Sequence, residues 1–459
     1  MKNHKKEHLI LGLRLALFLL PFVIGFFGFI IVQGESPLWA VYHSIRLYTF
    51  NTDISDLNVL IEIARWLAPV AMCTTLIMLA RSLCTRLKNR FRSFSKNSVS
   101  VYGDNPDAQL LIKELGRRGI SGNLSNPLPS RYHILITHDN AAAAEFYSRF
   151  ADDLPEKSRI FVCLDGISPM SLQQKRITAF SIEENSASVY WRRFPAVPGE
   201  RIALLGNVRM LDTMLCKALL VNIYSEKQHI EYHFWGSDGA FLTSRVMAQS
   251  AADLASDILV EHTGSFYKDI DFLNNMDRVI LCMEEEQNLV AVSKIKELCC
   301  KPKIYIYSRN TTAVSSFFEN SVTCFGEAES VISPEIIMHE RLTENAKKVN
   351  AHYREKYGGS EWEDLSVFLR QSNISAAEFF PVLKKLYNQG VSFDELTRLE
   401  HIRWCRFHFL NNWRYSTKRD DKMRLHPCLL PFDNLTKEEQ LKDTENVRLA
   451  LTDEIHLEV

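Results

Sequence analysis

The sequence predicts a membrane α-helical hairpin, then two tandem α/β domains with parallel sheets, and a small, mostly helical C-terminal domain. Residues 15–34 form a run of about twenty uncharged residues, the length that a helix needs to cross the hydrocarbon core of a bilayer. Between residues 98 and 340, short apolar segments alternate with helical patterns, which indicates parallel sheets covered by helices. After residue 392, aromatic, arginine and His-Pro motifs cluster within a short stretch.

The hairpin occupies residues 1–96 and contains a second apolar run, residues 66–80. This run extends to about Cys84 if Arg81 reaches back to the lipid headgroups. A secretory signal peptide is the alternative for the first run. It is disfavoured because the apolar core is too long, no small-x-small cleavage site follows, and a second span comes soon after. We therefore expect a two-span protein with the lipid bilayer as its partner.

The charges that flank the two runs predict the orientation. Basic residues lie before the first run and after the second, whereas the loop between them is mainly acidic; the basic residues are Lys2, Lys5, Lys6, Arg81, Arg86, Lys88, Arg90 and Arg92. Cytoplasmic loops carry an excess of lysine and arginine. The pattern therefore predicts an inner (plasma) membrane protein with both termini in the cytoplasm.

The loop between the spans has helical apolar spacing from Ser36 and ends in an extended Thr-Phe-Asn-Thr segment. A span, a short re-entrant helix, an extended segment and a second span resemble the pore unit of potassium channels in layout. The resemblance implies that the residues lining the pore are Thr49, Phe50, Asn51, Thr52 and Asp53. This segment lacks the glycines of a potassium filter, and the alternative is an amphipathic loop in the membrane interface. A two-span unit cannot enclose a pore alone, so a channel requires a homo-oligomer, with a tetramer favoured.

Composition excludes several classes of function. The 459 residues carry a formal net charge of −1, so nothing indicates binding to nucleic acid. The ten cysteines include no C-x-x-C pair, which argues against a zinc site, and disulfides are not expected in a cytoplasmic domain. We expect no metal.

The first α/β domain, predicted at residues 97–223, begins with strands at 98–102, 133–137 and 159–163. A helix follows each of the first two strands. The turn after the first strand is where a dinucleotide phosphate would meet a helix N-terminus. Only Gly103 is present there, and Asp104 and Asp107 would face the phosphates. We therefore interpret this domain as a scaffold without a cofactor.

The second α/β domain, predicted at residues 224–345, repeats the pattern with a strand at 230–235, a turn and a helix at 241–250. Gly236, Ser237 and Gly239 form the turn, and Glu261 lies where a ribose-binding carboxylate would fall. This unit could hold a nucleotide or dinucleotide cofactor. Close packing of the helix on the strand explains the glycines equally well.

Two tandem Rossmann-like units behind a two-span hairpin resemble the TrkA-N/RCK regulatory domains of potassium channels and transporters. The resemblance rests on the layout and on the turns at Gly103, Gly236 and Gly239. It implies a ring of such domains that acts on pore-lining helices through a linker.

Beyond a helical connector predicted at residues 346–391, the last domain, residues 392–459, carries several motifs in order. They are a His-x-x-Trp helix ending at Trp404, an Asn-Trp-Arg-Tyr turn at 412–415, Arg-Asp-Asp at 419–421, and His-Pro at 426–427 before a final helix. This order resembles the ryanodine-receptor (RyR) repeat, with Asn412 and Ser416 where that family usually has glycine. The resemblance implies a module for sensing or interaction.

The same block contains the side chains that a nucleotide needs. Trp404, Trp413 and Tyr415 offer stacking faces, and Arg403, Arg414 and Arg419 suit a phosphate. Glu400, Asp420 and Asp421 could bind ribose hydroxyls or an amine, and we include His426 in the candidate site. The alternative is that the tryptophans belong to the core and that His426-Pro427 is a structural turn.

No group of residues has the spacing of a catalytic site, so we do not expect an enzyme. We expect a ligand-gated membrane effector or ion channel that senses a small nucleotide-type signal. Prokaryotic proteins of similar build suggest a role in stress or phage defence. The alternative is a membrane-tethered, dinucleotide-dependent enzyme that uses the Gly236–Glu261 unit.

Overall fold

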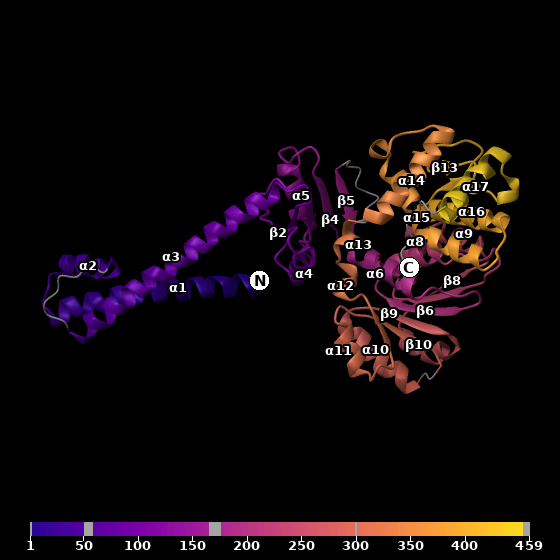
Figure 1. Cartoon of the computed structure of the whole chain (residues 1–459). Helices are drawn as coiled ribbons and strands as arrows, with labels where there is room; N and C mark the ends of the chain where they lie inside the picture. The colour runs from indigo at the N-terminus through magenta and orange to yellow at the C-terminus, as the bar shows by residue number, and fades with distance from the viewer. Residues whose placement is uncertain (1, 50–57, 165–175, 299–300, 339, 453–459) are drawn as a thin grey trace. The chain divides into compact units, whose positions relative to one another are not determined.

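The computed structural model describes residues 2–49, 58–164, 176–298, 301–338 and 340–452 (Figure 1). The chain divides into two compact units, residues 1–92 and 93–459.

The first unit is helical. It contains α1 (Lys2–Phe27), a π-helical turn (Gly28–Val32), α2 (Pro37–Arg46), a 3-10 turn (Leu47–Thr49) and α3 (Val59–Ser93). A Cβ at Gly28 would lie 2.9 Å from the side chain of Ile61, so glycine allows the π-helical turn and α3 to approach closely here. Side chains of the three helices form a small core that includes Phe29, Ala40 and Ala64.

Among the described residues, α3 is the one helix with the length and apolar composition of a membrane span, and residues 15–31 form a shorter apolar helix. Many apolar side chains of both helices are exposed, Leu15 and Val70 each by 60%. Of the predicted pore residues, Thr49 ends the 3-10 turn and its hydroxyl donates to the carbonyl of Arg46. Residues 50–53, which hold Phe50, Asn51, Thr52 and Asp53, lie outside the described residues.

The second unit begins with a five-stranded sheet whose strands pair in parallel in the order β2-β1-β3-β4-β5. Its elements are β1 (Val99–Tyr102), α4 (Pro106–Leu115), β2 (Gly119–Ser121), β3 (Tyr132–Leu135), α5 (Asn140–Phe150), β4 (Arg159–Cys163) and β5 (Ile177–Phe180). This is the order of a flavodoxin-like doubly wound sheet. The described strands therefore confirm a parallel-sheet α/β domain.

A six-stranded parallel sheet follows, in the order β11-β10-β9-β6-β7-β8. Its strands are β6 (Arg201–Gly206), β7 (Glu231–Trp235), β8 (Ile258–His262), β9 (Arg278–Cys282), β10 (Lys303–Tyr307) and β11 (Thr323–Phe325). The helices around it are α6 (Ile182–Arg193), α7 (Val208–Val221), α8 (Ala240–Ser244), α9 (Ala248–Asp253), two 3-10 turns (Phe266–Lys268 and Ile270–Asn275), α10 (Glu285–Leu298) and α11 (Thr311–Phe317). Numbered from β6, this is the strand order of a Rossmann fold.

This topology corrects two predictions. The boundary predicted at residues 223–224 falls inside the second sheet, because β6 pairs with β7 and β9. The turn that meets phosphate in a Rossmann unit follows the first strand, which is β6 rather than β7. The glycine at that place is Gly206, and the Asn207 side chain next to it caps α7 by accepting from the amide of Met210.

The remaining chain is mostly helical. The short helices α12 (Ala328–Val331) and α13 (Pro334–Met338) pack on the first sheet, and α14 (Glu340–Tyr357) is the next helix of the chain. After a 3-10 turn (Trp362–Asp364) come α15 (Val367–Asn388), α16 (Phe393–Leu410), the paired β12 (Arg414–Tyr415) and β13 (Leu425–His426), another 3-10 turn (Phe432–Asn434) and α17 (Lys437–Leu451).

Helix α16 lies beside α9 (Figure 1) and also packs against α7, another helix on the second sheet. The buried guanidinium of Arg406 donates to the carbonyls of Leu219, Ala251 and Ala252 and pairs with Asp257 at 2.7 Å. These contacts tie the C-terminal helices to the second sheet.

Candidate functional site

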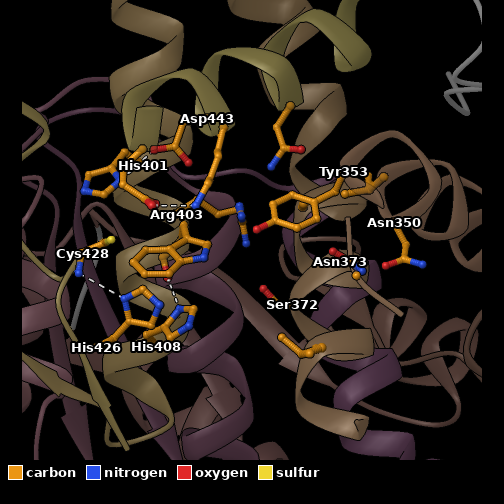
Figure 2. Close-up of a pocket in the computed structure, with 18 of the residues that line it drawn as sticks. Asn350, Tyr353, Ser372, Asn373, His401, Arg403, His408, His426, Cys428 and Asp443 are labelled. Carbon is orange, nitrogen blue, oxygen red and sulfur yellow. Dashed lines mark hydrogen bonds and ion pairs between the residues drawn. The ribbon is translucent and has the colours of Figure 1, made fainter. Parts of the chain in front are cut away.

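A cavity at the C-terminal helices has a volume of about 480 Å³, within the range of about 300–1,000 Å³ typical of small-ligand sites. One wall comes from α16, α17 and the segment around β13, and the other from α14 and α15. Figure 2 shows residues of both walls: His401, Arg403, His408 and His426 on the first, and Asn350, Tyr353, Ser372 and Asn373 on the second.

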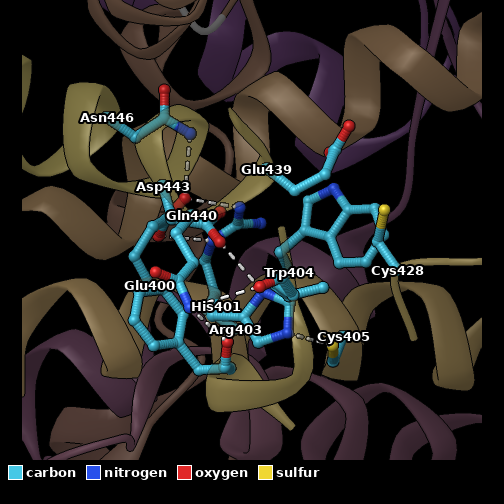
Figure 3. Close-up of polar contacts among 12 residues, drawn as sticks. Glu400, His401, Arg403, Trp404, Cys405, Cys428, Glu439, Gln440, Asp443 and Asn446 are labelled. Carbon is cyan, nitrogen blue, oxygen red and sulfur yellow. Dashed lines mark hydrogen bonds and ion pairs between the residues drawn. The ribbon is translucent and has the colours of Figure 1, made fainter. Parts of the chain in front are cut away.

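Arg403 is almost completely buried, and only part of its guanidinium has partners. Its Nε and Nη2 donate to the carboxylate of Glu400 at 2.9 and 2.7 Å, and Asn446 donates to the same carboxylate (Figure 3). Its Nη1 is buried and has no hydrogen-bond partner. A buried charged donor without an acceptor is costly, so this nitrogen favours a ligand oxygen in the cavity.

Three aromatic rings lie together on the same wall. The ring of Trp404 is centred 3.9 Å from that of His408 and 4.9 Å from that of His426. All three residues line the cavity. Such a wall offers a planar ligand both a face for stacking and ring edges for polar contacts.

Hydrogen bonds fix the tautomers of both histidines. His408 Nδ1 lies 2.9 Å from the carbonyl of Trp404, so it carries a proton and Nε2 is an acceptor. His426 Nδ1 accepts from the amide of Cys428, so Nε2 carries the proton. Burial lowers the pKa of His408 to about 3 and the pKa of His426 to about 4. Both rings are therefore neutral at pH 7.

His401 is different, because both of its ring nitrogens face acceptors. Nδ1 lies 2.9 Å from a carboxylate oxygen of Asp443, and Nε2 lies 2.8 Å from the carbonyl of Leu430. Burial is the largest single influence and opposes the charged ring, but the interactions with Asp443 and Cys405 together outweigh it and raise the pKa of His401 to about 11. This residue is an imidazolium held by a carboxylate.

The other charges that line the cavity are paired as well. Arg419 meets Asp421 at 2.7 Å, and Lys442 meets Glu439 at 2.6 Å. The phenol of Tyr353, on α14, points toward Arg403 from the opposite wall (Figure 2). Among the described residues, no group of three or more histidine, cysteine or acidic side chains is arranged to hold a metal ion.

The structure brings together part of the predicted ligand site. Arg403, Trp404, Arg419 and His426 line the cavity, and Glu400 lies behind it as the partner of Arg403. The other five predicted residues do not line it: Trp413, Arg414, Tyr415, Asp420 and Asp421.

Trp413 belongs to the core instead. It is 5% exposed and stacks on Phe368 of α15, with ring centres 5.0 Å apart. Arg414 and Tyr415 are exposed on β12, and Asp420 accepts two amides of its own turn, while Asp421 holds Arg419. The prediction that Trp413 offers a stacking face is therefore corrected.

Sequence reasoning missed the second wall. Asn350, Tyr353, Ser372 and Asn373 lie in α14 and α15, within the stretch predicted as a connector. On α16 the spacing of His401, Trp404 and His408, three and four residues apart, indicates one helix face. That spacing could have identified His408.

Three of the predicted cofactor residues, Gly236, Ser237 and Gly239, lie in the turn after β7, and the fourth, Glu261, reaches this turn from β8. The amide of Gly239 donates to Glu261 at 2.7 Å, and the hydroxyl of Ser237 accepts from the amide of Phe241. A Cβ at Gly236 would lie 2.0 Å from the carbonyl oxygen of Gly206. Gly236 is thus explained without a ligand, by the close approach of the ends of β7 and β6, rather than by the packing of a helix on the strand that the sequence suggested as the alternative.

Residues 388–455 match the family model of the RyR domain. The C-terminal resemblance is thereby confirmed, and the second wall of the cavity lies outside the matched residues. Comparison with curated proteins and with solved structures found no match.

Proposed function

We propose that this chain, which ends in an RyR domain, is a membrane-anchored receptor for a small nucleotide-type ligand. In this proposal the ligand occupies the cavity between α14, α15 and the RyR domain, and its binding acts on the membrane hairpin. The protein is then a ligand-gated effector rather than an enzyme.

The observation that carries the proposal is the unpartnered Nη1 of Arg403. It is a buried, charged donor at the wall of a cavity large enough for a nucleotide. Arginine hydrogen bonds to phosphate oxygens are charge-assisted and strong. A phosphate oxygen at this nitrogen would satisfy a group that the protein itself leaves unsatisfied.

The base of the nucleotide would stack next to the phosphate that Arg403 binds. The indole of Trp404 and the two neutral imidazoles form an aromatic wall next to Arg403. Tyr353 lies across the cavity, from α14. Bases stack on aromatic side chains with a free energy of about 1–3 kcal/mol each.

The cavity walls offer a route for coupling. The second wall includes α14, and the short helices before α14 pack on the first sheet through Val331 and Ile337. The two sheets are also joined by the ion pair of Arg309 with Asp107, at 2.6 Å. A ligand that favours one spacing of the walls would shift the first sheet, and the chain passes from α3 into β1 of that sheet.

The membrane part of the proposal rests on α3 and on the exposed apolar side chains of the first unit. We propose that both apolar helices cross the inner membrane with both termini in the cytoplasm. A conducting pore would need several copies around an axis, and four is the number that the channel-like layout favours.

The enzyme alternative has less support. At the second sheet, the Asn207 side chain already binds the N-terminus of α7, and the carboxylate of Glu261, in β8, already accepts from the amide of Gly239. A dinucleotide would have to displace both contacts.

The proposal is tested with the full-length protein in detergent and a panel of mononucleotides, cyclic nucleotides and dinucleotides. Binding is measured by calorimetry for the parent protein, for Trp404→Leu, and for the control Tyr415→Leu, whose exposed ring lies outside the cavity. Loss of the stacking face predicts an affinity lower by about 5- to 150-fold for Trp404→Leu alone. If no member of the panel binds, or if both variants lose affinity equally, the proposal fails.

A further inference from the structure

The cationic side chains that line the cavity are already neutralised. Each has one carboxylate of its own: Arg403 has Glu400, His401 has Asp443, Arg419 has Asp421, and Lys442 has Glu439. Figure 3 shows the first two pairs, with Asn446 donating to the carboxylate of Glu400. The remaining titratable rings facing the cavity, His408 and His426, are neutral at pH 7. The site therefore has no excess of positive charge.

What remains for an anion is one donor group. Nη1 of Arg403 is buried without a partner, while the Nε and Nη2 of the same side chain are occupied by Glu400. The opposite wall adds neutral groups only, among them Asn350, Ser372 and Asn373. The cavity thus presents one free charged nitrogen within polar but uncharged surroundings.

We infer that the cavity selects a nucleotide whose phosphate is a singly charged phosphodiester, over nucleotides that carry a terminal phosphate or a polyphosphate. The inference rests on the proposed function and specifies its ligand class. The anionic oxygen of a phosphodiester can accept one charge-assisted hydrogen bond from the unpartnered Nη1 of Arg403. Each additional charge would be buried without a partner, or would have to break an existing ion pair, and both are costly.

The test compares ligands that share a base and differ in charge. Full-length protein in detergent is titrated with 3′,5′-cyclic AMP, AMP and ATP, and with the corresponding guanine and uracil series. We expect the cyclic nucleotide of the preferred base to bind at least about tenfold more tightly than the monophosphate, and the triphosphate to bind most weakly. A rise in affinity with charge would overturn the inference but leave the proposed function standing. If none of the nucleotides binds, both fail.

A pH series separates charge from shape. A terminal phosphate loses its second negative charge near pH 6, so AMP should gain affinity between pH 7.5 and pH 5.5. The cyclic monophosphate should not. The two cavity histidines stay neutral over this range, because the pKa values of His408 and His426 are about 3 and about 4. Equal pH dependence of the two ligands would contradict the inference.

A variant that changes the charge of the cavity provides a third readout. Glu439→Gln releases Lys442 from its partner and gives the cavity one unit of positive charge. It should raise the affinity for AMP relative to cyclic AMP, whereas Glu438→Gln, at an exposed neighbouring position, should leave the ratio unchanged.

Arg403→Lys keeps a cation beside Glu400 but removes the free nitrogen, and it should weaken the binding of cyclic AMP by about tenfold or more. An unchanged ratio in Glu439→Gln would count against the inference even if the Arg403 variant fails to fold.

Discussion

Replacement of Arg406 by methionine tests how the RyR domain is held on the second sheet. The guanidinium and its partner Asp257 are both fully buried, and the guanidinium also donates to three main-chain carbonyls. These carbonyls belong to α7 and α9, so a single side chain of α16 satisfies atoms on both helices. Arg406→Met would remove one donor from each of these carbonyls and from the buried carboxylate of Asp257.

The size of the expected loss of stability depends on the hydrogen bonds that Asp257 keeps in the variant. Removing one partner of a buried ion pair typically costs about 3–5 kcal/mol. Asp257 would still accept from the amide of Ile230 and from the side chain of Gln228. The carboxylate therefore stays partly satisfied, and we expect a loss near the lower end, about 3 kcal/mol.

The assay is native-state hydrogen exchange of the full-length protein, followed in peptides of α16 and α9. The free energy of local opening should fall by about 3 kcal/mol in both helices. The control is Arg398→Met, at another position of α16. It removes an exposed ion pair with Asp433 and should change the free energy of opening of α16 much less. A loss below about 1 kcal/mol for Arg406→Met, or a loss confined to α16, would refute the reasoning.

Three further predictions concern other parts of the chain. A cysteine at Leu38 should react with an impermeant maleimide on intact cells and one at Ser95 should not; the opposite result would contradict the orientation. Gly236→Ala should lower the melting temperature more than Gly239→Ala, because only the first added Cβ meets a backbone atom, and equal losses would contradict this explanation. The stabilisation from the charged ring of His401 is present below pH 6.5 and is lost as the pH rises toward about 11. Between pH 6.5 and 10 the parent protein should therefore lose stability relative to His401→Gln. If the free energy of unfolding changes equally with pH in the two proteins, His401 is not a charged, stabilising ring.

The class of fold could be predicted because local pattern carries it. Strands β1, β3, β4 and β9 are apolar runs of four or five residues, and caps such as Asn105 and Asp139 mark the helices that follow. The order of the strands could not be predicted in the same way. Which strand stands at the centre depends on pairing of β6 with β9, which lie more than seventy residues apart.

In the candidate site too, some features follow from the local sequence and others depend on contacts between distant residues. Arg403 and Trp404 could be identified because the motif places them on one helix. Trp404 and Trp413 look alike in sequence, and only the docking of Phe368 against the second places it in the core. The unpartnered nitrogen of Arg403 is a property of packing, so no pattern in the sequence indicates it.

The account is tested most directly by photoaffinity labelling of the full-length protein with an azido-substituted cyclic nucleotide, followed by mapping of the modified peptides. We predict labelling in α14 near Tyr353 or in the segment from Trp404 to Cys428, and competition by the unmodified nucleotide. Labelling at the Gly236–Glu261 turn instead, with none in the RyR domain, would contradict the account.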